Sequence, residues 1–329
     1  SQSDWSSDVC SSDLWRYLKM FYLRHLKSVR SGKTPFLLKS VLSLTILLLT
    51  VVVLQSMLKL RSQASRLKSD TCESSDFRQQ YLPPGIYEQL LRMAQTGRRA
   101  ADTVLLRVSD RESVATLSVS GDFAERFSDL LTATMLNTDF YPAKPVPDST
   151  AYQKYKPAEY EELKKSYQSI WSDLVYFPIP SREINFEDTF GAPREYRGHR
   201  THEGCDLFGR NKTPGYYPVL SITDGIVENI GWLPLGGYRI GIRAPKGGYF
   251  YYAHLSTYEK EFQTGEEIQA GDILGYMGNT GYGEEGTTAM FPVHLHLGIY
   301  IRTPHCEELS VNPYWVLKAI SKKIRNYSY

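Results

Sequence analysis

The stretch VHLHLGIYI, residues 293–301, decides the fold class of this chain. Apolar residues alternate with other types along it, and this period of two is typical of a β-strand with one buried face. On such a strand His294 and His296 share one face, while Val293, Leu295 and Leu297 share the other. Burying two imidazoles without partners costs free energy, so this pair indicates a functional site.

The same texture extends in both directions from this strand. Short apolar stretches are separated by glycine-rich turns such as DG, PLGG, PKGG and TGYGEEG. Turn signals at this spacing predict an antiparallel, mainly β domain over residues 175–312. Helical spacing of apolar residues predicts a helix before it, residues 151–174, and a closing helix after it, residues 313–329.

Two further motifs contain histidine. His202 and Asp206 stand four residues apart in HEGCD, and His254 ends the aromatic segment YFYYAHL. On a strand, residues four apart lie on the same side. Imidazole nitrogen and carboxylate oxygen are common zinc ligands, so His202 and Asp206 are candidates for one metal site.

Taken together, the motifs occur in the order H-x-x-x-D, Y-x-H-L, H-x-H. In this order the sequence resembles the lysostaphin/LytM-type family of zinc metallopeptidases over about residues 194–312. The connecting segments SITDGIVENIGW and GEEIQAGDILGYMGNTG also resemble that family. The resemblance implies a mainly β catalytic domain of the duplicated hybrid motif type.

The resemblance also implies roles for five residues. His202, Asp206 and His296 would bind zinc, leaving one position open for water. His254 and His294 would be the catalytic histidines, one accepting a proton from the attacking water and the other stabilising the intermediate. Which histidine has which role stays open. Tyr196 matches a tyrosine that supports the oxyanion in some relatives, and His199 and His305 are expected at the surface.

The N-terminal part predicts a membrane anchor. Residues 15–39 contain seven Lys or Arg and no acid, and residues 40–58 are apolar and uncharged. Nineteen residues at 1.5 Å each approach the roughly 30 Å apolar core of a bilayer. No small-residue cleavage site follows, so a transmembrane helix is favoured over a signal peptide. The basic flank predicts a single-pass protein of the cell membrane with its C-terminal domain outside the cytoplasm.

The remaining segments are less informative. Residues 1–14 resemble the translation of a sequencing-adapter oligonucleotide, so we exclude them from fold reasoning. Residues 59–150 predict a polar linker and a mainly helical spacer. The four cysteines form no C-x-x-C pair. A disulfide between Cys205 and Cys306 stays open, and Cys205, next to the candidate ligands, is expected to be buried in the core.

These observations favour one function. The formal net charge of +2, and the lack of a long Lys/Arg run with interleaved aromatic residues in the C-terminal half, argue against nucleic-acid binding. We expect a membrane-anchored zinc metalloendopeptidase that acts on peptidoglycan peptides. The alternative is a catalytically silent domain of this family that serves as a binding or activating partner in division or sporulation. All the expected ligands and catalytic histidines are present, which favours the enzyme.

Overall fold

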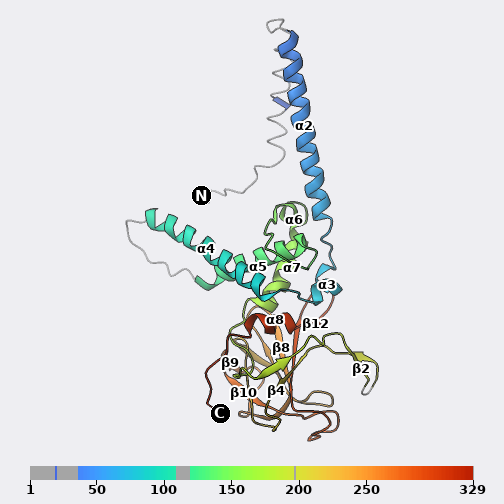
Figure 1. The fold of residues 1–329 in the computed structure, drawn as a ribbon, viewed down its shortest axis with the longest axis vertical. Helices are drawn as coiled ribbons and strands as arrows, with labels where there is room; N and C mark the ends of the chain where they lie inside the picture. Colours follow the sequence, from blue (N-terminus) through green and yellow to red (C-terminus); the bar gives the residue numbers. More distant parts are fainter. Residues whose placement is uncertain (1–18, 21–35, 109–118, 196–197, 329) are drawn as a thin grey trace. The chain divides into compact units, whose positions relative to one another are not determined.

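The structure is a computed structural model that describes residues 19–20, 36–108, 119–195 and 198–328 (Figure 1). Cys10, Tyr196, the adapter-like residues 1–14 and most of the basic segment lie outside the described residues. The chain divides into two units, Ser1–Ser62 and Gln63–Tyr329, and each is described by itself.

The first unit contains most of helix α2 (Phe36–Ala64). Within Leu38–Ala64, the most apolar 18-residue window has a mean hydropathy of 2.4, and none of that window is buried inside the protein. At 1.5 Å per residue, these 27 residues extend about 40 Å. Among the described residues this is the one helix long and apolar enough to span a membrane, which is consistent with the predicted anchor.

The second unit begins with a group of helices. They are α3 (Ser75–Arg78), α4 (Pro84–Val108), α5 (Val119–Asn137), α6 (Thr150–Tyr155) and α7 (Pro157–Trp171), with a 3-10 turn η1 (Thr71–Glu73) before them. Helix α7 begins at a proline, which suits the first turn because a proline lacks the N–H that would be unpaired there. Helices α4 and α5 pack together, and α5 also packs on α7, so the helical pattern of the sequence is confirmed.

The polar segment that follows α2 is packed against the rest of this unit. Leu67, Phe77 and Leu82 are completely or almost completely buried. The Arg78 guanidinium donates hydrogen bonds to the backbone oxygen and the hydroxyl of Ser310, at 2.9 and 2.8 Å. Composition predicted a linker here because only a few apolar residues, widely spaced, make these contacts.

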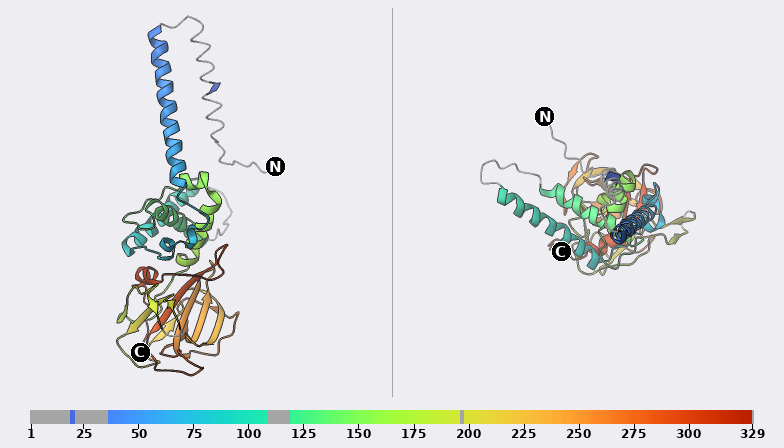
Figure 2. Two further views of the ribbon diagram at one scale, coloured as in Figure 1. Left: turned by 90° about the vertical axis from the view of Figure 1, so that its right-hand side faces the viewer. Right: turned by 90° about the horizontal axis from the view of Figure 1, so that it is seen from above.

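The rest of the second unit is a twisted antiparallel sheet (Figure 2). Its strands are β1 (Ile184–Phe186), β4 (Cys205–Gly209), β5 (Pro218–Leu220), β6 (Gly225–Leu233), β7 (Gly237–Arg243), β8 (Tyr249–Tyr258), β9 (Glu267–Ile268), β10 (Ile273–Met277), β11 (Leu295–Ile301) and β12 (Leu309–Val311). A separate hairpin joins β2 (Pro193–Arg194) to β3 (Arg200–Thr201). The predicted mainly β domain is therefore confirmed.

The strand order brings distant segments of the sequence together. The main path runs β1-β4-β11-β8-β7-β6-β9, so β11 lies between β4 and β8. In this register His296 pairs with Asp206 on one side and with Ala253 on the other. Leu207, Leu295 and other apolar side chains of these strands are buried in the core. The histidines therefore point away from a packed apolar layer.

A short helix follows the sheet. Helix α8 (Tyr314–Ile320) buries Val316, Leu317 and Ile320. The sequence predicted a helix over residues 313–329, and the observed helix ends earlier, at Ile320. Residues 321–328 are mostly polar and partly or fully exposed, so they offer no apolar face that would pack a longer helix onto the sheet.

Candidate metal centre

Three segments bring His202, Asp206 and His296 to one place. Asp206 belongs to β4, His296 to β11, and His202 lies in the loop just before β4. From the sequence, His202 was expected on the same strand as Asp206, and this prediction is wrong because the strand begins only at Cys205. The loop nevertheless turns the His202 ring towards the carboxylate, so the expected proximity holds.

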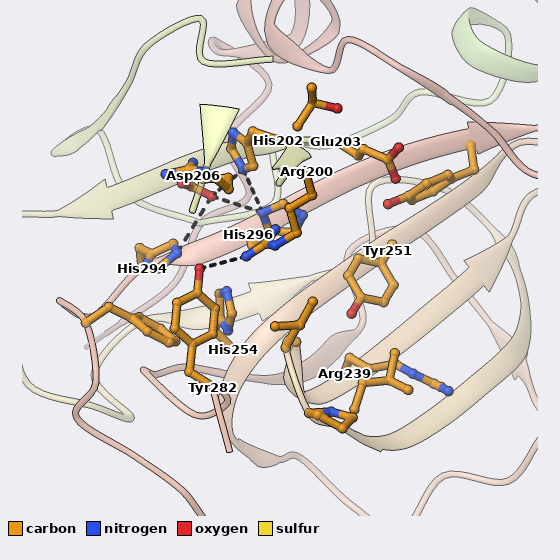
Figure 3. A pocket seen from close by; sticks show the side chains of 18 of the residues that line it. Arg200, His202, Glu203, Asp206, Arg239, Tyr251, His254, Tyr282, His294 and His296 are labelled. Atoms are coloured by element: carbon orange, nitrogen blue, oxygen red, sulfur yellow. Dashed lines mark hydrogen bonds and ion pairs between the residues drawn. The ribbon is translucent and has the colours of Figure 1, made fainter. Parts of the chain in front are cut away.

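The donor atoms of these residues form a nearly equilateral triangle (Figure 3). His202 Nε2 lies 3.0 Å from His296 Nδ1 and 3.1 Å from Asp206 Oδ1, and the third side, between His296 Nδ1 and Asp206 Oδ1, measures 3.0 Å. Three atoms at this spacing can all lie about 2.1 Å from a single point, which is the length of zinc–nitrogen and zinc–oxygen bonds. The donor set therefore fits a zinc ion.

Neighbouring groups orient the donors. His202 Nδ1 lies 3.1 Å from the carbonyl oxygen of Thr189 and 3.0 Å from its hydroxyl. When Nδ1–H donates to this carbonyl, the lone pair is left on Nε2, inside the triangle. Arg194 donates a hydrogen bond of 2.8 Å to Asp206 Oδ2, so Oδ1 remains available to the donor set.

The electrostatics of the centre favour the protonation states that a metal requires. Burial would raise the pKa of the Asp206 carboxyl, but the His202 and His296 rings beside it outweigh burial and hold the pKa below its ordinary value. Burial lowers the pKa of His296. An anionic carboxylate beside neutral imidazole is the state in which these groups bind a metal.

His254 and His294 lie beside the triangle, as Figure 3 shows. His254 Nδ1 is 2.8 Å from the carbonyl oxygen of Thr280, and His294 Nδ1 is 2.7 Å from that of Pro292. Each ring can donate Nδ1–H to its carbonyl and keep a lone pair on Nε2. The ring centroids are 4.8 Å apart, and His294 Nε2 is 3.7 Å from Asp206 Oδ1. Burial lowers the pKa of both histidines, so both rings are neutral at physiological pH and keep a lone pair.

The backbone at His254 is strained. Its φ angle is 63°, in the left-handed region that residues other than glycine rarely adopt. The register between β8 and β7 shifts near this residue, and the His254 N–H donates a hydrogen bond to the carbonyl oxygen of Gly236. Such strain is typical of functional sites, and here it turns the imidazole towards His294.

The centre lies in a groove of about 970 Å³. Arg200 donates a hydrogen bond of 3.1 Å to the Tyr282 hydroxyl, and its guanidinium lies 5.9 Å from the centroid of that ring. Thr189, Arg194 and this pair were not predicted from the sequence. No motif spacing marks them, because they reach the centre only through tertiary contacts.

The other histidines and the cysteines singled out in the sequence lie outside the donor set. His199 and His305 are exposed, as expected. Cys205 is buried in the core, with its thiol 3.4 Å from the carbonyl oxygen of Glu187. Cys205 and Cys306 are both free thiols, as is Cys72, so the possible disulfide does not form.

Comparison with known proteins identifies the class to which this fold and donor set belong. Residues 200–313 match the sequence profile of Peptidase family M23. The crystal structure of a LytM-type protein from Ruminococcus gnavus superposes with a TM-score of 0.63 and 37% identity, covering 81% of this chain and 98% of that one. The chain belongs to peptidase family M23, which confirms the resemblance found in the motifs.

Two curated relatives match the chain in part. The L-Ala–D-Glu endopeptidase of Bacillus subtilis is 39% identical over 163 residues, which cover 49% of this chain and 48% of that protein. Lysostaphin of Staphylococcus simulans is 36% identical over 83 residues, covering 25% and 16%. The matched part thus spans about half the length of the first relative and less of the second.

Proposed function

We propose that this chain is a membrane-anchored zinc metalloendopeptidase that hydrolyses peptide bonds of peptidoglycan. The observation that carries the proposal is the triangle of donor atoms from His202, Asp206 and His296 beside two further histidines whose Nε2 atoms are free to accept a proton. A structural metal site would not need these two bases in the same groove.

The proposed roles follow from the geometry. His202, Asp206 and His296 would hold zinc, which when bound polarises the scissile carbonyl and lowers the pKa of water. His294 Nε2 is 3.7 Å from Asp206 Oδ1, so a proton released at the donor set can be taken up at this nitrogen. His254, whose ring centroid lies 4.8 Å from that of His294 and 5.9 Å from that of His296, can hold a proton or donate a hydrogen bond to the substrate. Arg200 fixes the Tyr282 hydroxyl in the same groove.

The membrane anchor would determine on which side of the membrane the β-domain encounters its substrate. Helix α2 would cross the cytoplasmic membrane with the basic residues 15–39 inside, which leaves residues 63–329 on the outer side. Peptidoglycan lies on that side. The name of the Bacillus subtilis relative specifies cleavage between L-Ala and D-Glu, and this is the first bond to test in the chain described here.

The test uses the full chain in detergent micelles. Bound zinc is measured by elemental analysis, and hydrolysis is measured as new amino groups released from purified peptidoglycan. Asp206→Ala is expected to lose both zinc and activity. His294→Ala is expected to keep zinc and to lose activity by about 100-fold or more, the usual worth of a proton-transfer residue. His305→Ala, an exposed histidine, is the matched control and should behave as the parent protein.

The opposite result has a clear meaning. If the parent protein binds one zinc but releases no amino groups from any peptidoglycan preparation, the enzyme proposal is wrong. The silent binding or activating domain would then be the better description.

A further inference from the structure

The groove extends from the donor triangle along a wall of tyrosines. Tyr249 and Tyr251 belong to β8 and Tyr300 to β11, and their ring centroids lie 6.1 to 6.5 Å apart. The Tyr251 ring centroid is 6.0 Å from that of His296, so the wall begins directly beside the candidate ligands. Figure 3 shows Tyr251 on the side of the groove away from His294.

Glycines on the neighbouring strands make room for this wall. Gly241 of β7 and Gly298 of β11 both pair with Tyr251 across the sheet. A Cβ atom at Gly298 would lie 2.7 Å from the Tyr300 ring, and one at Gly241 would collide with the Tyr249 hydroxyl. The rings therefore lie over bare backbone, which fixes their positions and keeps this end of the groove open.

Arg239 of β7 lines the same end of the groove (Figure 3). Its Nη1 atom is buried and has no hydrogen-bond partner. Within the part of the chain that the structure describes, no carboxylate lies within ion-pairing distance of its guanidinium, whereas Arg194 is paired with Asp206 and Arg200 is bound to Tyr282. Partly burying a cation without a counter-charge costs free energy, so this position is unusual for a residue with a purely structural role.

The neighbouring tyrosines do not neutralise Arg239. Burial raises the pKa of Tyr251 and of Tyr249, and the positive charge of Arg239 opposes this only in part. Both phenols are therefore neutral at physiological pH. Glu203 and Glu308 also line the groove, but both are exposed to solvent and neither is paired with Arg239. The guanidinium keeps donors in a planar fork, which is the geometry that binds a carboxylate through two hydrogen bonds.

We propose that Arg239 binds a free carboxylate of the substrate, and that the groove therefore selects stem peptides whose γ-linked D-Glu carries an unamidated α-carboxylate. The inference rests on the proposed function and adds the substrate feature that is recognised. Tyr251 lies between the donor triangle and Arg239 in the same groove (Figure 3). A carboxylate bound by Arg239 therefore belongs to a residue near the bond that is cut. The carboxylate at the C-terminus of the stem is chemically similar, and the test must separate the two.

Three synthetic peptides make this separation. The first is L-Ala–γ-D-Glu–L-Lys with free carboxylates, the second has the glutamyl α-carboxylate converted to the amide, and the third has only the C-terminal carboxylate amidated. The value of kcat/KM is measured for the full chain in detergent, for Arg239→Gln and for Arg239→Lys. Arg210→Gln is the matched control, because Arg210 is exposed and its one ion pair, with Glu183, lies at the surface.

The parent protein is expected to prefer the first peptide to the second by about 10- to 100-fold, the worth of a hydrogen bond to a charged group. Arg239→Gln should abolish this preference, because it removes the charge that binds the glutamyl carboxylate. Arg239→Lys should keep part of the preference, because it keeps the charge but not the planar fork. Arg210→Gln should keep all of it, and the third peptide should be cut like the first.

Several results would overturn the inference. Equal cleavage of the first two peptides by the parent protein would do so, as would a dependence on the C-terminal amide instead. An Arg239→Gln variant that loses activity equally on both peptides would show a structural role. Binding of the same peptides to His294→Ala, measured by titration calorimetry, needs no turnover. It therefore tests Arg239 even if the parent protein cuts none of them, a result that would count against the proposed function alone.

Discussion

The side-chain amide of Asn312 donates a hydrogen bond of 2.9 Å to Oδ1 of Asp188, the residue that precedes Thr189. Thr189 in turn holds the Nδ1 atom of His202. The same amide group donates to Gln79 at 3.0 Å. The buried Asn312 thus connects the segment that follows the apolar helix to the loop that orients a candidate metal ligand.

We predict that Asn312→Ala weakens both stability and zinc binding. The substitution leaves the amide oxygen of Gln79 and the carboxylate of Asp188 without this donor, which should cost about 1–3 kcal/mol of unfolding free energy. Without this hydrogen bond the loop that contains Thr189 is held less firmly, and Thr189 orients the His202 ring. Zinc affinity should therefore fall by about 10-fold or more, as for other groups that orient metal ligands. Urea unfolding and competition with a zinc chelator measure the two effects.

The control for this prediction is Gln269→Ala, an exposed amide in a turn. If Asn312→Ala matches Gln269→Ala in both measurements, the connection from α3 to His202 has no energetic role.

A second prediction concerns the packed segment before α4. The Phe77 ring lies 5.1 Å from the Tyr167 ring, and Trp171 Nε1 donates a hydrogen bond of 2.8 Å to Gln80 Oε1. A chain shortened to begin at residue 150 would expose Tyr167 and Trp171. We expect it to lose about 3–5 kcal/mol of unfolding free energy, comparable to removing one large buried aromatic side chain.

A chain beginning at residue 63 is the matched control, because it lacks the apolar helix but keeps these contacts. Thermal unfolding followed by circular dichroism compares the two. Equal melting temperatures would show that residues 63–149 are a spacer without influence on the β-domain.

Much of this fold follows from local patterns in the sequence. The alternation in residues 293–301 is sufficient to predict an antiparallel sheet, and the ordered histidine motifs carry the family resemblance that implies His202, Asp206 and His296 as metal ligands. Strand alternation also explains why Cys205 points into the core while Asp206 faces the groove, since neighbouring residues on a strand have opposite faces.

Other features depend on register, which local patterns do not contain. His296 meets Asp206 only because β11 pairs with β4 across 90 residues of sequence. Arg194 and Arg239 reach the groove, and Thr189 reaches His202, through contacts of the same kind. The segment around Phe77 was predicted to be a linker for a related reason, because its few apolar residues are buried by elements far along the chain.

A third prediction concerns the pH dependence of stability and the ion pair between Glu228 of β6 and Arg243 of β7. Glu228 accepts hydrogen bonds from Arg243, which lower the pKa of its carboxyl below the ordinary value of about 4.3. The folded pKa is therefore the lower one. The pair stabilises the fold above the unfolded pKa, and the stabilisation is lost as pH falls through the folded pKa. With part of the pair exposed, we expect less than about 1 kcal/mol.

The measurement is the unfolding free energy of the parent protein and of Glu228→Gln between pH 7 and pH 3. The difference between them should shrink as the pH falls. Glu285→Gln, at an exposed position, should show no such change. A difference that stays constant, or that grows on acidification, would contradict the assignment.

The fourth prediction concerns Gly204, between His202 and Asp206. A Cβ atom at this position would lie 2.5 Å from Cε1 of His296 and 2.6 Å from the carbonyl oxygen of Leu297. Both distances are far below van der Waals contact, and the carbonyl belongs to the central strand and cannot move freely. Gly204→Ala should therefore push the His296 ring out of the donor triangle. Metal ligands tolerate errors of only about 0.2 Å, so we expect zinc affinity to fall by about 100-fold or more.

The comparison variant is Gly85→Ala, because a Cβ atom there meets nothing within 4 Å. It lies in the first turn of α4, where alanine is as good as glycine or better. Chelator competition should give Gly85→Ala the zinc affinity of the parent protein, and circular dichroism should show that Gly204→Ala keeps its sheet. A folded Gly204→Ala variant that binds zinc as tightly as the parent would mean that His296 does not bind the metal in the position described here, since the added methyl group and the present ring position exclude each other.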